Sequence, residues 1–244
     1  MAVMAKKRER KRHVQQTFEF RTWGGQRDGA GRKQVNERKS EAHRTRLELT
    51  RHHAAHVVLR SAPELARLRR ADAYKIIRKA MQVVLRRTDF RIVHVSIQAN
   101  HIHLLVEGES QYAVARGVQA FAISAARRLN KAEAAVRGTA RRGPAFPDRY
   151  HIKIIKNPRQ VRNELSYVLN NWRRHKEDRS PAVRHWRLDK YSSAISFPGW
   201  AERSAWSIPA DYEPLPVCQP TTWLLREGWK LHAAISVYEI PGRS

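Results

Sequence analysis

The sequence predicts an α+β fold of the ferredoxin-like, split βαβ type, with a four-stranded antiparallel sheet. Short segments of alternating hydrophobicity are separated by stretches with helical periodicity, in the order βαββαβ followed by one more helix. The chain has 244 residues, of which 41% are hydrophobic, so it can fill a core. Its single cysteine, Cys218, excludes an intramolecular disulfide framework and a zinc cluster made of cysteines.

The first half of the pattern lies between residues 55 and 107. Residues 55–60 are predicted to form a strand, and Pro63 and Glu64 to open a helix that runs to Leu85. Residues 90–98 alternate, so that one face carries Val93, Val95 and Ile97 and the other Ile92, His94, Ser96 and Gln98. After a turn at residues 99–100, residues 101–107 alternate again, with Ile102, Leu104 and Val106 on one face and His101, His103 and Leu105 on the other.

The second half comprises a helix over residues 111–131, a basic loop at 137–144, a strand at 150–156 and a last helix. Asn157 suits the N-cap of that helix and Pro158 its first position, and the helix should end near His175. Two helices covering one face of the sheet would leave the other face available for a site.

Two flanking regions differ in composition from this domain, which we assign to residues 51–176. Residues 1–50 form a basic arm whose glycine-containing segment carries Arg32 and Lys33, both suited to contact phosphates or a groove. Residues 177–244 form an extension rich in proline and tryptophan. The tryptophans either anchor the extension to the core or serve as stacking platforms for bases, and the sequence leaves both roles open.

The charge of the chain indicates its kind of partner. It contains 48 Lys and Arg against 22 Asp and Glu, for a formal net charge of +26. Such an excess points to nucleic acid rather than to small metabolites. No apolar run approaches the roughly 18 residues of a membrane span, and the basic N-terminal residues precede no apolar stretch. We therefore expect no membrane partner and a cytoplasmic, nucleoid-associated location.

A pair of histidines and a tyrosine helix carry the candidate chemistry. Residues i and i+2 of a strand face the same side, so His101 and His103 can offer two nitrogens to one divalent cation. A His-x-His pair alone is more often structural. In the last helix, at about 100° per residue, Tyr167 lies roughly opposite the apolar stripe and Asn171 about 40° from Tyr167. The stripe consists of Val161, Leu165, Val168, Leu169 and Trp172.

These motifs resemble those of the HUH single-tyrosine transposases. His101-Ile102-His103-Leu104-Leu105 matches the family's His-x-His strand motif, and Tyr167-Val168-Leu169-Asn170-Asn171 matches its tyrosine helix. Together with residues 146–151 (FPDRYH), the second region is similar to the REP-associated tyrosine transposase branch. The resemblance covers residues 51–176 well and the flanking regions more loosely.

The resemblance implies a metal-dependent enzyme that nicks and transfers single-stranded DNA at hairpin or REP-like palindromes. His101, His103 and Asn171 would bind Mg²⁺ or Mn²⁺, and Tyr167 would be the nucleophile that forms a 5′-phosphotyrosine. The family is commonly homodimeric, although its REP-associated members can be monomeric. Trp172 stands where the family often has proline, so we expect the helix to continue differently past the site.

Several assignments have rivals. Asn170 competes with Asn171 as the third ligand, and Tyr150 competes with Tyr167 as the nucleophile. The phosphate contacts assigned besides the basic arm are Arg149, Lys153 and Lys156. We expect the clustered histidines His52, His53 and His56 to line a basic face rather than to bind metal.

Two other functions stay open. One is a non-catalytic DNA- or RNA-binding protein with an RNA-recognition-like fold, and the other is a domesticated transposase that has lost cutting. The first would stack bases on aromatic rings of its central strands, whereas here the outer faces carry only histidine rings. The second is not favoured, because both motifs look intact.

Overall fold

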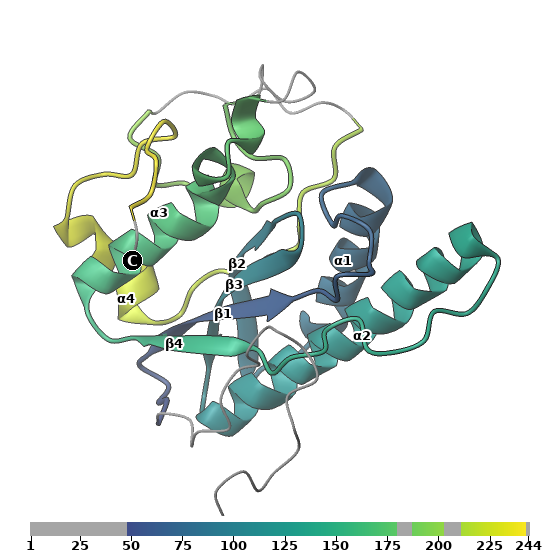
Figure 1. Ribbon diagram of the computed structural model, residues 1–244. Helices are drawn as coiled ribbons and strands as arrows, with labels where there is room; N and C mark the ends of the chain where they lie inside the picture. The colour runs from purple at the N-terminus through teal and green to yellow at the C-terminus, as the bar shows by residue number, and fades with distance from the viewer. Residues whose placement is uncertain (1–47, 180–186, 203–210, 243–244) are drawn as a thin grey trace, which may run out of the picture. The chain divides into compact units, whose positions relative to one another are not determined.

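The computed structural model describes residues 48–179, 187–202 and 211–242. Four antiparallel strands, β1 (Ala54–Arg60), β2 (Phe90–Ile97), β3 (His101–Gly108) and β4 (His151–Ile155), form one sheet in the order β2-β3-β1-β4. The two central strands are therefore β3, which carries the histidine pair, and β1 (Figure 1). This arrangement confirms the predicted α+β, ferredoxin-like fold.

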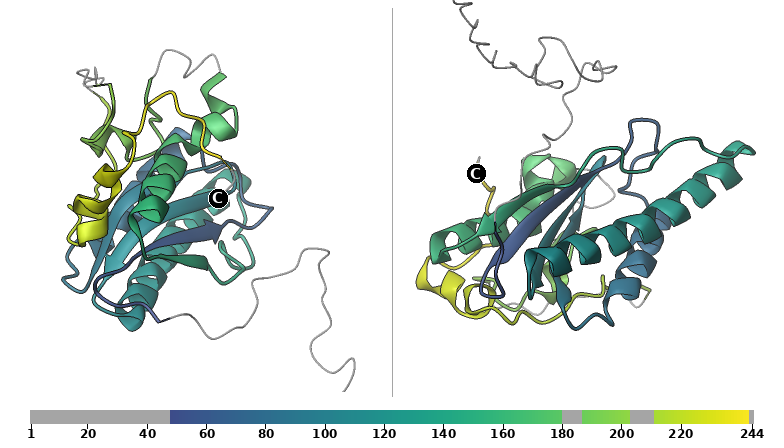
Figure 2. Two further views of the ribbon diagram at one scale, coloured as in Figure 1. Left: turned by 90° about the vertical axis from the view of Figure 1, so that its left-hand side faces the viewer. Right: turned by 90° about the horizontal axis from the view of Figure 1, so that it is seen from below.

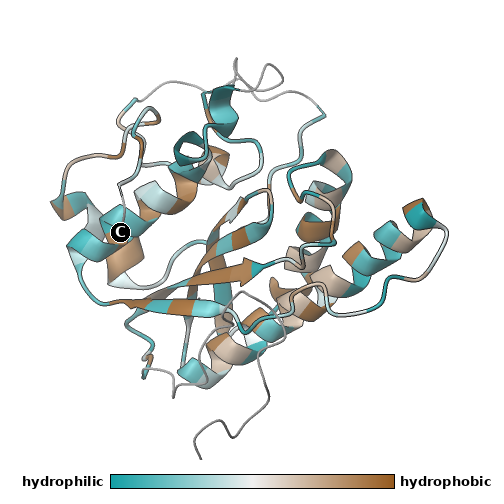
Figure 3. Cartoon of the chain, viewed as in Figure 1, coloured by the Kyte–Doolittle hydropathy of each residue, from teal (hydrophilic) through white to brown (hydrophobic). Residues whose placement is uncertain are grey.

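Helices α1 (Ala71–Val84) and α2 (Gln111–Arg137) cover one face of the sheet, as predicted. Their apolar residues and those of the strands form one buried cluster, which includes Ile77, Val118, Phe121, Val57 and Leu104. The alternating strand residues explain this layer, and Figure 3 shows hydrophobic residues dominating β1 while hydrophilic ones interrupt β4.

The other face of the sheet is covered by α3 (Pro158–Arg174) and by segments of the C-terminal extension. The Asn157 side chain accepts a hydrogen bond from Gln160 N at 2.9 Å, with Pro158 at the start of the helix, as the sequence predicts. Val161, Leu165 and Val168 then pack with the strands in a second buried cluster. Figure 2 shows the sheet between α3 on one side and α1 and α2 on the other. This face is therefore not bare, and the predicted site residues of β3 lie between the sheet and α3.

The first helix begins at Ala71 rather than at residues 63–65. The preceding backbone is committed to hydrogen bonds with distant parts of the chain, which a helix would not allow. Ala62 N donates to Ala145 O at 2.8 Å, and Leu68 N donates to Ala99 O at 2.8 Å. The apolar residues Leu65 and Leu68 are buried, but from an irregular segment.

A β-bulge in β2 corrects the predicted faces of that strand. The pairing register with β3 shifts between Ile92 and His94, so that one residue is inserted there. As a result Ile92 joins Val95 in the cluster under α1 and α2, whereas Val93 lies in the cluster under α3. Strict alternation had instead placed Val93 on the same face as Val95, and Ile92 on the other face.

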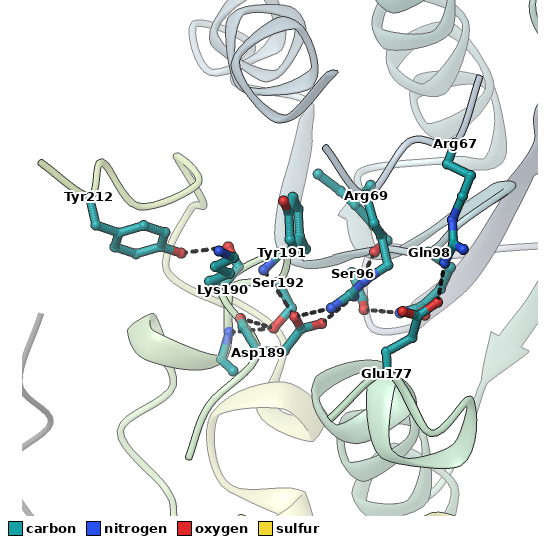
Figure 4. Close-up of polar contacts among 12 residues, drawn as sticks. Arg67, Arg69, Ser96, Gln98, Glu177, Asp189, Lys190, Tyr191, Ser192 and Tyr212 are labelled. Carbon is teal, nitrogen blue, oxygen red and sulfur yellow. Dashed lines mark hydrogen bonds and ion pairs between the residues drawn. The ribbon is translucent and has the colours of Figure 1, made fainter. Parts of the chain in front are cut away.

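A buried ion pair attaches the C-terminal extension to the edge of the sheet at β2 (Figure 4). Arg69 donates two hydrogen bonds to the Asp189 carboxylate, at 2.9 and 2.8 Å, and a third to Ile97 O at 3.0 Å. Ile97 N in turn donates to Tyr191 O at 2.8 Å. The extension is thus hydrogen-bonded to the last residue of β2.

Two tryptophans of the extension pack inside the cluster under α3. Trp200 and Trp229 are buried and both contact the Phe197 ring, with centroids 5.2 Å apart in each case. Their role is therefore anchoring rather than base stacking. Trp223 is 56% exposed, and Trp186 and Trp206 lie outside the described residues.

Residues 233–242, which we call the strap, run along the outer side of α3. Arg162 donates to Ala233 O, Ala234 O and the Glu239 carboxylate, and Ser166 Oγ donates to Glu239 at 2.6 Å. Farther along the helix three side chains donate to strap carbonyls, namely Asn170 to Ser236, Arg173 to Val237 and Arg174 to Gly242.

Within the described ranges, none of the helices is long and apolar enough to span a membrane.

Candidate active site

His101 and His103 lie side by side on β3, as their spacing predicts. Their ring centroids are 4.6 Å apart with the planes nearly perpendicular. They project toward α3, because Ile102 and Leu104 between and beside them point into the cluster under α1 and α2. His103 is only 3% exposed, so this is not the flat, open surface that single-stranded DNA would find in a bare sheet.

A second pair of residues, His56 and Glu164, adjoins His103. His56 Nε2 is 2.8 Å from His103 Nδ1, and His56 Nδ1 is 2.7 Å from Glu164 Oε2. The other carboxylate oxygen, Oε1, is 2.7 Å from Lys153 Nζ. A continuous polar chain therefore runs from Lys153 through Glu164 and His56 to His103.

The electrostatics of this chain favour a charged Glu164 and an uncharged His103. Burial by itself raises the pKa of Glu164, but the hydrogen bonds and charges of His56 and Lys153 outweigh it, so the net pKa is lowered. Burial lowers the pKa of His103 well below its usual value, and the neighbouring His56 and His101 lower it further. A neutral imidazole is the form that can donate a lone pair to a cation.

Tyr167 lies beside the histidines. Its ring centroid is 5.3 Å from that of His103 and 5.7 Å from that of His56, in edge-on arrangements. The Arg174 guanidinium lies 5.4 Å from the centre of the Tyr167 ring. The imidazole and the phenol thus meet within one chain, without a contribution from a second copy.

Asn171 and Asn170 differ in their surroundings. The Asn170 amide donates to Ser236 O of the strap at 2.9 Å, which turns it away from the histidines. Both amide atoms of Asn171 are buried with no hydrogen-bond partner among the described residues. At about 100° per residue, Asn171 follows Glu164 and precedes His175 on one stripe of α3. Because Glu164 meets His56 and the His175 ring lies 5.7 Å from that of His101, this stripe faces the histidines.

The residues present fit a divalent cation. Like both amide atoms of Asn171, His103 Nε2 is buried and has no hydrogen-bond partner among the described residues. Buried polar atoms are normally paired, so these side chains are arranged as though for a ligand. Among residues 48–179, 187–202 and 211–242, no three His, Cys, Asp or Glu side chains are grouped to hold a metal. The predicted set of His101, His103 and Asn171, which adds an amide oxygen to two imidazoles, stays a prediction.

The other predicted residues have varied positions. Arg149 and Lys156 are exposed near the ends of β4, whereas Lys153 is ion-paired with Glu164. Tyr150, the rival nucleophile, packs against the cluster under α1 and α2 and so lies on the opposite side of the sheet from the histidines. Arg32 and Lys33 lie outside the described residues.

Sequence reasoning missed His56 and Glu164. His56 was grouped with His52 and His53 on a basic face, but it is 6% exposed and faces His103. Pairing β1 with β3 could have found it, because His56 lies opposite Leu105 and Val58 opposite His103. In an antiparallel pair such diagonal neighbours share a face.

Two cavities accompany these features. One of about 220 Å³ lies beside Tyr167, between α3 and the strap, and is lined by Arg162, Ser166 and Glu239 among others. The other, of about 630 Å³, lies between α1 and the extension and is lined by three tyrosines and several cations. The tyrosines are Tyr74, Tyr191 and Tyr212, the cations include Lys75 and Lys79, and the carboxylates of Asp211 and Glu213 also line the cavity.

Comparison with known proteins assigns the chain to a family. It is similar to the structure of a REP-associated tyrosine transposase bound to a REP hairpin, with 17% identity and a TM-score of 0.40 over 55% of this chain and 74% of that one. It is also similar to a putative transposase from Deinococcus radiodurans, with 16% identity and a TM-score of 0.33 over 52% and 94% of the two chains. Among curated proteins, none matches this chain. The family model of IS200-like transposases matches residues 50–171, a span that includes β1, β3 and α3 as far as Asn171. The chain therefore belongs to the IS200-like transposase family.

Proposed function

We propose that this transposase cuts single-stranded DNA and transfers the strand through a covalent bond to Tyr167, at hairpin or REP-like palindromic sequences. One observation carries the proposal, namely that the Tyr167 ring lies 5.3 Å from that of His103 within the same chain. A phenol beside candidate cation ligands is the arrangement that nucleophilic attack on a phosphodiester needs. Membership of the family supports DNA as the substrate, and the hairpin preference rests on the resemblance of the motifs.

His101, His103 and the Asn171 amide oxygen would hold Mg²⁺ or Mn²⁺. When bound, such a cation neutralises charge on a phosphate oxygen. The Tyr167 oxygen then forms a bond to phosphorus while the bond from phosphorus to the 3′-oxygen breaks. The phenol loses its proton and the 3′-oxygen gains one, so the step is balanced and needs no external energy source. The product is a 5′-phosphotyrosine and a free 3′-hydroxyl, and attack by such a hydroxyl reverses the step or transfers the strand.

Positive charge near Tyr167 supports this role. The Arg174 side chain lies over the phenol ring, and Arg162 lines the adjoining cavity of about 220 Å³. A guanidinium pairs well with a nearby phosphate. Because His103 and Asn171 are buried, DNA must displace part of α3 or of the strap before a phosphate can reach them.

The tyrosine-lined cavity offers a second contact for DNA within the same function. The Tyr74 and Tyr191 rings meet edge-on, with their centroids 5.9 Å apart. The volume of the cavity, about 630 Å³, can admit a nucleotide. Aromatic rings beside cations suit single-stranded nucleic acid, because bases stack while phosphates pair with charge. Lys75 and Lys79 are one helical turn apart and exposed.

A covalent-adduct assay tests the proposed function. A hairpin oligonucleotide labelled at its 3′ end is incubated with the full chain and Mg²⁺ or Mn²⁺, because a 5′-phosphotyrosine retains the downstream fragment. We expect a labelled protein band that is absent in Tyr167→Phe, strongly reduced in His103→Ala and retained in the matched control Tyr150→Phe. A band that persists in Tyr167→Phe would refute the assignment. Hairpin binding without any adduct in the unmodified chain would favour the non-catalytic alternative, a binding protein or domesticated transposase.

A further inference from the structure

We propose that the outward face of α2 is a separate surface that docks the phosphate backbone of double-stranded DNA, whatever its sequence. The face carries Arg116, Arg127 and Lys131, and we call these three residues the basic ridge. The inference goes beyond the proposed function, which concerns single-stranded DNA at Tyr167, and rests on it only in taking DNA as the nucleic acid. The ridge is on the other side of the sheet from the histidines, because α2 covers the opposite face.

The ridge residues share one stripe of the helix. At about 100° per residue, Arg116, Arg127 and Lys131 fall within an arc of about 60°, and a rise of about 1.5 Å per residue separates the first from the last by about 22 Å. All three side chains are exposed, while Val118 and Phe121 of the opposite stripe pack on the sheet. The C-terminal part of α2 extends past the strands (Figures 1 and 2). The ridge is therefore a straight and accessible row of cations.

The charge of the ridge is not balanced by the protein. Among the described residues, no carboxylate forms an ion pair with a ridge cation. The only acidic residue of α2, Glu133, is buried and pairs with Arg70 and Arg137 instead. Arg127 and Lys131 are four residues apart, a spacing at which like charges on a helix repel each other. An approaching polyanion would relieve this repulsion, so the charges favour such a partner.

The geometry favours a duplex over a single strand. A duplex carries its phosphates at a fixed spacing of about 3.4 Å of axis on each strand, so a rigid row of about 22 Å spans about six of them. Sites for single strands stack bases on aromatic rings. Between Arg116 and Lys131 the only aromatic residue is Phe121, which is buried against the sheet. Contacts made to phosphates alone carry no sequence information, so binding should depend on charge and hardly on sequence.

Fluorescence anisotropy with the full chain tests this inference without any cutting. The protein carries Tyr167→Phe and no divalent metal is added. The probes are a blunt linear duplex of unrelated sequence and an unpaired oligonucleotide of the same length. At about 0.1 M salt, Arg127→Ala/Lys131→Ala should bind the duplex on the order of 10- to 100-fold more weakly. The slope of the logarithm of the binding constant against that of the salt concentration should fall in magnitude by about 1.8. The affinity for the unpaired oligonucleotide should change little, and an equal loss there would overturn the assignment to duplex DNA.

The matched control is Arg226→Ala/Lys230→Ala, which removes one arginine and one lysine four residues apart from the exposed surface of the C-terminal extension. These residues end and follow the short helix α4 (Trp223–Arg226), which packs in the cluster under α3 on the other side of the sheet. The control should bind the duplex like its parent. A loss as large as that of the ridge variant would mean that only net charge matters, and would overturn the proposal.

Two features guard against a trivial loss of structure. Alanine is the strongest helix former, so α2 should persist in the ridge variant, as circular dichroism checks. The exchange Arg127→Lys/Lys131→Arg keeps both charges and should keep duplex binding. Failure of this exchange to bind the duplex would contradict a role based on charge.

The outcomes separate the ridge from the cutting reaction. If the ridge variant loses duplex binding as expected but no covalent adduct forms at Tyr167 in the unmodified protein, the ridge stands and the proposed function fails. If the adduct forms but the ridge variant binds the duplex like its parent, the ridge is refuted and the proposed function stands.

Discussion

Substitution of Asp189 by asparagine should destabilise the protein strongly. The Arg69 and Asp189 side chains are 5% and 1% exposed, and two hydrogen bonds of 2.9 and 2.8 Å join them. In Asp189→Asn the side-chain amide nitrogen and an Arg69 nitrogen, both hydrogen-bond donors, would face each other. The buried guanidinium would remain charged without a carboxylate to balance it. Removing one partner of a buried ion pair costs about 3–5 kcal/mol, and because one oxygen still accepts, we expect about 3 kcal/mol.

Urea denaturation of the full chain measures this loss. With a slope of about 2 kcal/mol per molar urea, a loss of about 3 kcal/mol lowers the midpoint by about 1.5 M. The control is Glu213→Gln in the same extension, which breaks an ion pair with Arg78 whose glutamate is 71% exposed. Exposed pairs contribute about 1 kcal/mol or less. If Asp189→Asn shifts the midpoint no more than Glu213→Gln does, the attachment of the extension to β2 does not depend on this pair.

Two further predictions concern pH and DNA. Burial lowers the pKa of His94 to about 4 from an ordinary value of 6.5. Because the unfolded chain binds the proton first, the free energy of unfolding should fall by up to about 3 kcal/mol as the pH falls from about 6.5 to about 4. The pH dependence of the urea midpoint should flatten in His94→Asn, and an unchanged slope would contradict the prediction. The double substitution of Lys75 and Lys79 by alanine should weaken the binding of single-stranded DNA. The slope of the logarithm of the binding constant against the logarithm of the salt concentration should fall in magnitude by up to about two, as fluorescence anisotropy at several salt concentrations would show. An unaltered slope would mean that DNA does not contact the tyrosine-lined cavity.

The order of elements and the face of the histidine pair were predictable because each depends on local periodicity. His101 and His103 share a face in any regular strand, and Asn157 with Pro158 marks the start of α3 by local chemistry. The start of α1 was not predictable, because hydrogen bonds from distant residues hold the segment before Ala71 outside a helix. The bulge at Val93 likewise leaves no mark in a pattern of consecutive apolar residues.

The residues that surround the candidate ligands were harder to predict than the candidate ligands themselves. Glu164 sits in a helix with many charged residues, where a carboxylate is ordinarily solvated, and only the packing of α3 on the sheet buries it. His56 required the register between β1 and β3, which sequence periodicity does not contain. Residues defined by contacts between distant elements thus escape a reading of local patterns.

The strap bears on whether α3 could be exchanged between two copies of the protein. Five side chains along α3, from Arg162 to Arg174, are bonded to residues 233–242 of the same chain. Lending this helix to a neighbouring copy would require all of those bonds to be undone at once. Under the proposed reaction, the molecule that severs a strand therefore keeps hold of the severed end, and the religation step falls to that same molecule. On that proposal, we expect a single copy to suffice for both cutting and joining.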